Sequence, residues 1–509
     1  MNKTYPFRLY NSLSRQKDIF RPKVSDKVSV YSCGVTVYDY CHLGHGLQAY
    51  TIGILVGYLK RLGYEVKHIR NYTDVDDKII ARAQQRDIKP LELSERMIEC
   101  ARRDFLSLGV LENFTEVKVS ENLKAIISMI EDLISAGHAY ATDDGHVYFD
   151  VLSKHDYGKL SGQKVDCHHA SAREIKSGHK RNEQDFVLWK PEKIEGAYWA
   201  SPWGDGRPGW HIECSALAKM YLGDSIDIHC GGLDLIFPHH ENEIAQSECA
   251  NGCEFARFWV HNGLLTIDKQ KMSKSLGNFI TIEDCVRRFH PEVIKLAFCQ
   301  NHYRSNLDLS EQIFIQTLKK LLYFYQTLQT CEGLMQRLDM PYICQKFKLA
   351  ITLHDAKCIP QEVLPHLHPH GAEFVKLLEE VTEAMADDLN TPKAFAAIHQ
   401  VFKLLNQVMA GKKSKEIAAL CSWVRQHLDD WFALFGILQQ SPEKMLHLLS
   451  LQGIEALGVK QAEVEALLAA RATARENKNW MESDRIRDQL EQLGVAVLDR
   501  AGETFWTLA

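Results

Sequence analysis

The stretch Cys33-Gly34-Val35-Thr36-Val37-Tyr38-Asp39-Tyr40-Cys41-His42-Leu43-Gly44-His45 decides the fold class of this 509-residue chain. The alternating run Val28–Ser32 before it predicts a β-strand, and the apolar run Ala49–Leu59 after it is long enough to predict a helix. Leu62-Gly63 ends that helix, and Glu65–Arg70 predicts a second strand. Strand, helix and strand form a βαβ unit. We therefore predict an α/β fold with a Rossmann-like, doubly wound parallel sheet that binds ligands at the carboxyl ends of its strands.

Two histidines and a glycine lie where the first helix is expected to begin. A helix start presents free backbone N–H groups and the positive end of the helix dipole, so it favours an anion such as phosphate. Gly44 would let a phosphate approach the backbone, while His42 and His45 would donate hydrogen bonds to its oxygens. An ordinary turn with locally satisfied histidines remains an equal alternative at this point.

A second motif, Lys271-Met272-Ser273-Lys274-Ser275-Leu276-Gly277-Asn278, lies far downstream. Two lysines three positions apart supply mobile positive charges for a polyphosphate leaving group, although a solvated basic turn would look the same in isolation. Both motifs in this order resemble the two signature sequences of class I aminoacyl-tRNA synthetases. The residues between them narrow the resemblance to the cysteinyl-tRNA synthetase family.

Composition sets outer bounds on these interpretations. A chain of 509 residues exceeds the size of a single core, so several domains are expected. The net charge of -6 means that a nucleic-acid partner would need a local basic surface. The 14 cysteines include no C-x-x-C pair, which favours reduced thiols in a cytosol. The amino-terminal residues lack a signal-peptide core and no apolar run approaches ~20 residues, so we predict a cytoplasmic protein without a membrane segment.

Three domains are expected along the chain. Residues 1–309 would form the catalytic domain, with an insertion at about 115–200 and the region of the lysine motif at about 255–309. Residues 310–440 would form a helical bundle that binds tRNA. Residues 441–509 would form a small mixed domain that recognises the anticodon.

Local patterns refine this division. The sheet is expected to resume near Asp185–Trp189 after the insertion. Apolar stripes predict the bundle helices, and one helix is expected to begin with Thr391 as its cap and Pro392 at its first position. The acidic segment Asn71–Lys78 lies at the end of a strand and either serves the site or caps the following helix. The segment at about 335–374 is longer than the family core and has no predicted role.

Four residues are candidate metal ligands, namely Cys33, Cys214, His239 and Glu243. Two thiolates, an imidazole and a carboxylate suit zinc, and the last two would share one helix face. From the residues alone, buried free cysteines are the commoner outcome, and His240 or Glu241 would compete as ligands. The family resemblance implies the first set and a zinc ion that coordinates the substrate thiolate. A shape-based pocket rejects serine by only ~100-fold, so the metal would provide the discrimination.

The resemblance implies ATP-dependent ligation of L-cysteine to tRNA(Cys) through a cysteinyl-adenylate. It also implies one Zn²⁺ per chain, Mg²⁺ with ATP, and a monomer. Matched position by position, the family motifs imply phosphate stabilisation by His42, His45, Lys271 and Lys274; ATP binding by Gly44, His229, Gly231, Gly232 and Lys274; a cysteine pocket lined by Gly34, Thr36, Thr73, Trp210 and Asp234; and anticodon recognition by Arg475, Trp480 and Asp484.

The chain departs from the family pattern at several positions. Cys230 replaces a glycine, and Leu47 and Gly53 replace an arginine and an aspartate. For Trp480, packing within a helix is almost as good an interpretation as base stacking. Two rival functions are a ligase that joins cysteine to an amino sugar, which would not need the carboxyl-terminal domains, and a non-catalytic RNA-binding protein, which would not need the intact motifs.

Overall fold

The computed structural model describes residues 5–110, 114–163, 180–271, 279–336, 342–344, 349–351, 368–411, 414–500 and 503–508. Its catalytic half is built on a parallel sheet with the strand order β11-β10-β3-β4-β5. These strands are β3 (Lys27–Thr36), β4 (Glu65–Thr73), β5 (Thr115–Lys118), β10 (Ile226–Gly232) and β11 (Ala256–Asn262). The predicted α/β fold with a doubly wound parallel sheet is therefore confirmed.

Helix α1 (Leu43–Arg61) joins β3 to β4 and completes the predicted βαβ unit. Most of its residues are buried, because one side faces the sheet and another faces the helical bundle, where Tyr50 donates to the carbonyl of Phe435 (2.8 Å). Leu62 caps its carboxyl end, and Gly63 follows with φ +95°, a conformation that favours glycine. The helix begins six residues before the predicted apolar run.

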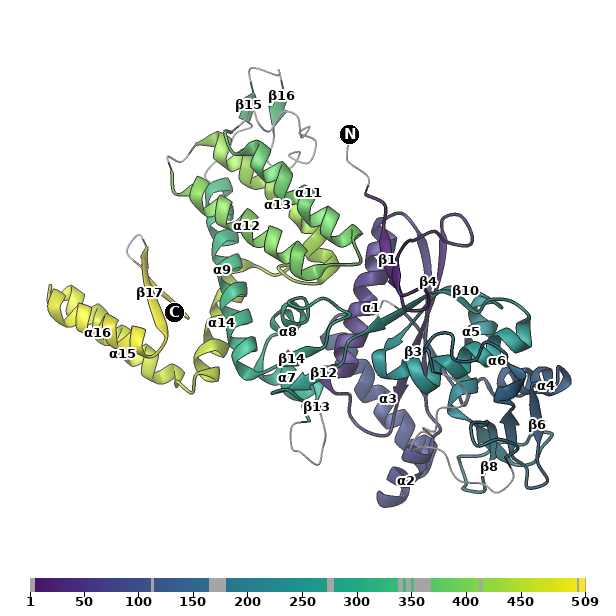
Figure 1. Ribbon diagram of the computed structural model, residues 1–509. Coiled ribbons are helices and arrows are strands. Elements are labelled where there is room, and N and C mark those ends of the chain that lie inside the picture. Colours follow the sequence, from purple (N-terminus) through teal and green to yellow (C-terminus); the bar gives the residue numbers. More distant parts are fainter. Residues whose placement is uncertain are drawn as a thin grey trace.

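Further helices surround the sheet or pack on the helices next to it (Figure 1). They are α2 (Asp77–Gln85), α3 (Pro90–Ser107), α4 (Leu123–Ser135), α5 (Trp210–Leu222), α6 (Glu241–Asn251), α7 (Ile282–Arg288) and α8 (Pro291–Phe298). Asp76 caps α2 by accepting a hydrogen bond from the N–H of Lys78 (2.9 Å). The capping interpretation of the acidic segment is therefore confirmed for Asp76.

The insertion carries its own antiparallel sheet with the order β6-β7-β8-β9. Its strands are β6 (Ala139–Ala141), β7 (Val147–Phe149), β8 (Phe186–Pro191) and β9 (Gly206–Pro208). The expectation that the central sheet resumes near Asp185–Trp189 is wrong, because β8 pairs with β7, where Phe186 stacks on Phe149 (4.9 Å), and the parallel sheet resumes only at β10. The insertion was expected to begin at about residue 115. However, β5 (Thr115–Lys118) pairs with β4 and is the edge strand of the parallel sheet, so the insertion begins after it.

The carboxyl-terminal half is mostly helical. Its helices are α9 (Glu311–Gln336), α11 (Gly371–Ala386), α12 (Thr391–Met409), α13 (Lys415–Phe435), α14 (Pro442–Ala456), α15 (Gln461–Glu476) and α16 (Trp480–Gln492). The cap of α12 is Asn390, whose side chain accepts from Lys393 N–H (3.1 Å), so the prediction of Thr391 as cap is wrong by one residue. Thr391 is itself buried, which leaves the amide of Asn390 to cap the helix.

Short strand pairs complete the fold. They are β1 (Arg8–Asn11) with β2 (Gln16–Ile19), β12 (Leu265–Ile267) with β13 (Gln270–Lys271) and β14 (Leu307–Leu309), β15 (Tyr342–Cys344) with β16 (Leu349–Ile351), and β17 (Val495–Arg500) with β18 (Glu503–Leu508). Figure 1 shows α15 and α16 at one end of the molecule and the insertion at the other. Among the described residues, no helix is long and apolar enough to cross a membrane.

Candidate active site and metal centre

The ladder between β3 and β4 shifts register between Ser32 and Val35, and Gly34 lies within this irregularity. A Cβ at Gly34 would lie 1.3 Å from the carbonyl oxygen of Asn71, so no larger residue fits. The Asn71 side chain also accepts a hydrogen bond from Gly34 N–H (2.9 Å). This close approach fixes the end of β3, where Cys33 lies.

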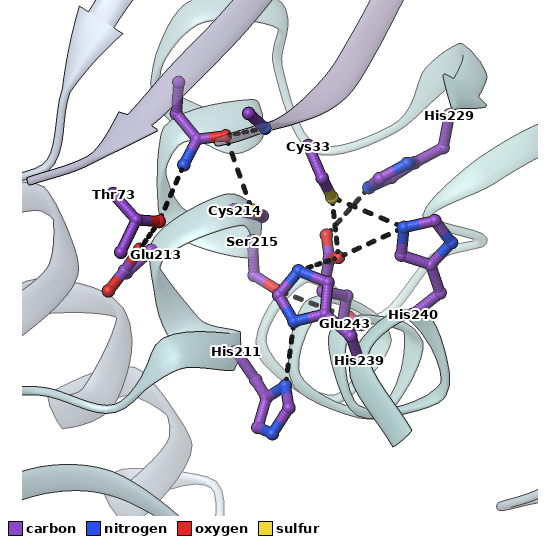
Figure 2. Close-up of polar contacts among 12 residues, drawn as sticks. Cys33, Thr73, His211, Glu213, Cys214, Ser215, His229, His239, His240 and Glu243 are labelled. Atoms are coloured by element: carbon purple, nitrogen blue, oxygen red, sulfur yellow. Dashed lines mark hydrogen bonds and ion pairs between the residues drawn. The ribbon is translucent and has the colours of Figure 1, made fainter. Parts of the chain in front are cut away.

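The four predicted metal ligands lie together (Figure 2). Cys33 comes from β3, Cys214 from α5, His239 from the turn before α6, and Glu243 from α6 itself. One ligand atom from each lies within 4.8 Å of the others, and all four residues are at most 3% exposed. His239 and Glu243 lie on one face as predicted, with Nε2 and Oε1 3.0 Å apart. Helical geometry and sheet topology thus bring together cysteines that are far apart in the sequence.

Two groups of this cluster, Cys214 and Glu243, are held in their anionic forms. Burial raises the pKa of Cys33 well above its ordinary value. Burial also opposes the thiolate of Cys214, but hydrogen bonding with Cys33 and contact with His239 lower its pKa to about 6. Although burial disfavours its charged form, the imidazoles of His229 and His239 hold the pKa of Glu243 well below its ordinary range. Thiolate and carboxylate donors in a dry site are the environment that zinc prefers.

A second candidate set shares Cys33 and Glu243 but substitutes His229 and His240 for the other two. The ring of His229 is already held by the Glu243 carboxylate (2.7 Å), and His240 Nδ1 by a neighbouring histidine. Within the described residues, each set contains one histidine nitrogen without a hydrogen bond, Nε2 of His239 in the first and Nδ1 of His229 in the second. The geometry therefore leaves both sets open, and the first is the one that the family resemblance implies.

Glu241, the other competing ligand, has a different partner. Its carboxylate accepts the backbone N–H groups of Gly158, Leu160 and Ser161, at 2.9, 3.2 and 2.8 Å. Those bonds anchor the insertion to α6 and leave Glu241 outside both candidate ligand sets.

A cavity of about 530 Å³ opens beside the cluster, between the central sheet and the insertion. Trp210 and Asp234 line it, as predicted for the cysteine pocket, and Trp210 stacks on His239 (4.1 Å between ring centroids). His211, which the sequence analysis did not single out, also lines it and contacts His239 through its Nδ1 atom (2.9 Å). The insertion and β4 end contribute further polar and aromatic groups, including Lys78, His146, Tyr148, Lys180, Lys190 and Arg207.

The predicted pocket residue Thr73 is buried at the end of β4, paired with Thr36 in the ladder. Its hydroxyl donates to the buried carboxylate of Glu213 (2.6 Å), and the Asn71 amide donates to it (3.4 Å). Asn71 in turn contacts the Cys214 sulfur (3.7 Å). Asn71 and Glu213 were missed because a single buried amide or carboxylate carries no motif.

The first phosphate motif forms the cap of α1. His42 is the N-cap, its ring accepts from Gly44 N–H (3.1 Å), and His45 reaches back to His42 N–H (3.4 Å). The two rings stack with centroids 3.7 Å apart. Burial holds the pKa of His45 well below its ordinary value, so the ring is neutral. These local hydrogen bonds are those expected if the histidines only stabilise a turn. The N–H of Gly44, which was expected to be available for a phosphate, is bound by the ring of His42.

The segment that follows the second motif pairs with the first motif through the backbone. His42 forms an isolated antiparallel bridge with Thr281, and Ile282 N–H donates to the carbonyl of Cys41 (3.0 Å). Lys271, the first residue of the second motif, lies in β13, whose backbone pairs with β12, whereas Lys274 lies outside the described residues.

Strand β10 carries the remaining predicted ATP residues, His229, Gly231 and Gly232. His229 is fully buried and faces the metal cluster. A Cβ at Gly231 would lie 2.4 Å from the ring of His240, so glycine is required there. The departure at Cys230 points to the opposite face of the sheet, into the apolar core. It therefore does not obstruct this face.

The predicted anticodon residues lie on α15 and α16. Trp480 is 59% exposed, so the interpretation of a packed helix residue is wrong, because the side chain stands at the first position of α16. Arg475 forms an ion pair with Asp499, and Asp484 is exposed.

Comparison with known proteins identifies three segments. Residues 19–319 match the catalytic domain model of class I (C) tRNA synthetases, residues 380–439 match the DALR domain, and residues 461–506 match the cysteinyl-tRNA ligase anticodon binding domain. Among solved structures, the methionyl-tRNA synthetase of Mycobacterium tuberculosis in complex with methionyl-adenylate aligns with a TM-score of 0.60 at 14% identity, covering 86% of this chain and 95% of that one. At that identity the likeness shows the fold alone.

Curated relatives are similar along nearly the whole chain. The cysteine–tRNA ligase of Pelobacter propionicus is 41% identical over 98% of this chain and 99% of its own length. The chloroplastic and mitochondrial cysteine–tRNA ligase of Arabidopsis thaliana is 39% identical over 98% of this chain and 85% of its own. The chain therefore belongs to the cysteinyl-tRNA synthetase family of class I aminoacyl-tRNA synthetases, which ligate cysteine to tRNA with ATP as co-substrate.

Proposed function

We propose that this enzyme activates L-cysteine as cysteinyl-adenylate, transfers it to tRNA(Cys), and selects cysteine by its thiolate with a zinc ion. The observation that carries the proposal is the buried cluster of Cys33, Cys214, His239 and Glu243, with its ligand atoms within 4.8 Å of one another beside a cavity of about 530 Å³. The volume of this cavity lies in the range of small-ligand sites.

Zinc held by these four residues prefers a soft thiolate to a hydroxyl and lowers the pKa of a thiol that binds it. The residues around it orient the rest of the substrate. Trp210 covers His239 and closes one wall of the cavity, while the carboxylate of Asp234 lies at the same wall and attracts the substrate ammonium group. Thr73, Gly34 and Thr36 complete the pocket from the ends of β3 and β4.

Adenylate formation needs no general base, because the attacking carboxylate of cysteine is already ionised. It attacks the α-phosphorus of ATP, the bond to the bridging oxygen breaks, and pyrophosphate leaves. Neutral His45, stacked on His42, donates a hydrogen bond to the phosphate oxygens as charge develops. Lys271 and Lys274 neutralise the departing pyrophosphate, which Mg²⁺ accompanies.

Transfer to tRNA follows when the 3′-terminal adenosine hydroxyl attacks the carbonyl carbon of the adenylate and AMP leaves. In the earlier step of adenylate formation, the nucleotide is bordered by His229, Gly231, Gly232 and Gly44. At the far end of the molecule Trp480 stacks on a splayed anticodon base, with Arg475 and Asp484 as hydrogen-bonding partners. The enzyme acts as a monomer.

The test is cysteine-dependent exchange of labelled pyrophosphate into ATP, without tRNA, before and after zinc chelation and with serine in parallel. We expect exchange with cysteine alone, collapse on chelation and recovery with added zinc. His239→Ala and His240→Ala distinguish the two candidate ligand sets, because only the former removes a ligand of the proposed set. Exchange that survives complete removal of metal would contradict the proposal, and so would equal activation of serine.

A further inference from the structure

The connection between α11 and α12 in the helical bundle contains a buried charge. Asp388 is 0% exposed and has φ +66°, and Leu389 follows with φ +51°. Consecutive non-glycine residues in the left-handed region are disfavoured and persist where tertiary contacts hold them. The contacts of Asp388 therefore show which interactions stabilise this unusual backbone conformation.

The hydrogen-bond partners of the Asp388 carboxylate come from outside the bundle. Its Oδ1 accepts from the N–H of Tyr10 on β1 (2.8 Å) and from the hydroxyl of Tyr303 (2.7 Å). Its Oδ2 accepts from Nε of Arg304 (2.8 Å), which neutralises the charge. The N–H of Asp388 donates to the carbonyl of Arg8 (2.9 Å), so both ends of the residue grip β1.

Strand β1 leads from this contact to the metal cluster. Immediately after it, Ser12 N–H donates to the carbonyl of Trp259 on β11 (2.9 Å), and Trp259 N–H donates to the side chain of Asn11 (3.0 Å). The hydroxyl of Ser12 contacts Nδ1 of His261 (2.7 Å). The amino-terminal strand is thus fixed to the bundle at one end and to a buried histidine at the other.

That histidine is the first of a pair behind the metal centre. Nε2 of His261 contacts Nδ1 of His240 (2.8 Å), and Nε2 of His240 contacts the sulfur of Cys33 (3.3 Å; Figure 2). The three side chains are at most 3% exposed. Ser12, His261, His240 and Cys33 are therefore linked by consecutive polar contacts. A displacement of Ser12 would reorient both imidazole rings and alter the contact of His240 with the Cys33 sulfur.

We propose that Asp388 is a positioning residue for the cysteine site, acting from the helical bundle through β1, Ser12 and the pair His261 and His240 on Cys33. This inference rests on the proposed metal function of Cys33. Through this contact, the geometry of the amino-acid site depends on how the helical bundle packs against the catalytic domain.

The test compares Asp388→Asn with Glu292→Gln in the full-length, metal-loaded enzyme. Glu292 is a matched control, because it is a buried carboxylate at the same junction. It accepts from the hydroxyl of Tyr325 (2.8 Å) and from Leu438 N–H (2.9 Å), and within the described residues it makes no hydrogen bond with β1. In pyrophosphate exchange without tRNA, Asp388→Asn should raise the KM for cysteine about 3- to 30-fold and leave the KM for ATP unchanged. Glu292→Gln should change neither.

A spectroscopic readout separates positioning from simple destabilisation. In protein loaded with Co²⁺ in place of zinc, Asp388→Asn should shift the thiolate-to-cobalt absorption bands, and Glu292→Gln should not. Ser12→Ala, which leaves the bundle contact intact, should shift them in the same direction. The double variant should add nothing to the larger single effect, because both changes interrupt one path.

Unchanged bands and an unchanged KM for cysteine in Asp388→Asn would overturn the inference, and so would the same changes in Glu292→Gln. If Asp388→Asn does not fold, Ser12→Ala decides, since its failure to alter either readout refutes the path. Failure of the proposed function looks different, because the unmodified chain would then bind no cobalt.

Discussion

The metal cluster and the carboxyl-terminal tRNA surface are built in opposite ways. The four candidate ligands are at most 3% exposed and contact one another from three segments of the chain, whereas Trp480 and Met481 at the start of α16 are 59% and 84% exposed. A ligand of a few atoms requires a dry, rigid site, while an RNA base requires a surface that it can reach. Substitutions should therefore damage different steps: amino-acid activation in the first region, and tRNA charging alone in the second.

The largest effect is expected at the metal cluster. Replacing Cys214 by serine removes a thiolate ligand, and we expect pyrophosphate exchange with cysteine to fall by more than about 100-fold, with loss of bound zinc. Cys230→Ser is the matched control. The Cys230 thiol is also buried, but it lies on β10 and faces the apolar core rather than the ligand cluster. Equal losses in both variants would mean that the effect is one of folding rather than of metal binding.

A smaller and more selective effect is expected at the exposed end. Trp480→Ala should lower kcat/KM for charging tRNA(Cys) by about 10- to 100-fold, the range expected for one stacked base. Exchange without tRNA and the thermal midpoint should not change, because the indole covers little protein surface. Met481→Ala is the neighbouring control. A loss of exchange activity in Trp480→Ala would contradict the separation of the two regions.

Asp104 provides the smallest effect and a contrast within the buried class. Its side chain is 7% exposed and lines a cavity of about 330 Å³. Among the described residues, its carboxylate has no hydrogen-bond donor. Burial raises the pKa of Asp104 to about 6, with further contributions from Glu283 and Asp284. The folded state therefore holds this proton more tightly than the unfolded chain, and the free energy of unfolding falls as the pH rises from about 4 to about 6.

Asp104→Asn should consequently stabilise the protein by about 1–2 kcal/mol at pH 7.5, a rise of a few degrees in the first melting transition, and by about half as much at pH 5. Asp185→Asn should instead destabilise the protein, because that buried carboxylate accepts from Tyr140 (2.6 Å) and from two backbone N–H groups. Melting curves at the two pH values measure both. Destabilisation by Asp104→Asn at pH 7.5 would show that the carboxylate has a partner in solution.

The sequence predicted those features that depend on local periodicity or on the chemistry of residue types. The βαβ unit follows from alternating and helical apolar patterns. The choice of ligand set came from the family resemblance, because the residues alone left His240 and Glu241 as competing ligands. The assignment of Asp185–Trp189 to the central sheet failed because an apolar run does not specify which sheet it joins. The cap of α12 was misplaced by one residue because Asn390 and Thr391 are both good caps.

Contacts between distant segments left no signal in the sequence. The hydrogen bonds of Glu213 with Thr73, and of Asp388 with β1, join residues more than a hundred positions apart, and each depends on the complete fold. The local hydrogen bonding of His42 was foreseen only as an ordinary turn with satisfied histidines, and its place as the cap of α1 was not predicted.

The attachment of the insertion to α6 limits how far this protein can be recombined. Glu241 accepts three N–H groups from the segment 158–161, Asn242 accepts from the hydroxyl of Tyr157 (2.5 Å), and Glu248 pairs with Lys154 and Lys159. The same helix carries Glu243 between these anchors. A chimera that imports the insertion of a relative should therefore import α6 with it, because the insertion and the helix that carries the proposed ligand Glu243 are held together by these contacts.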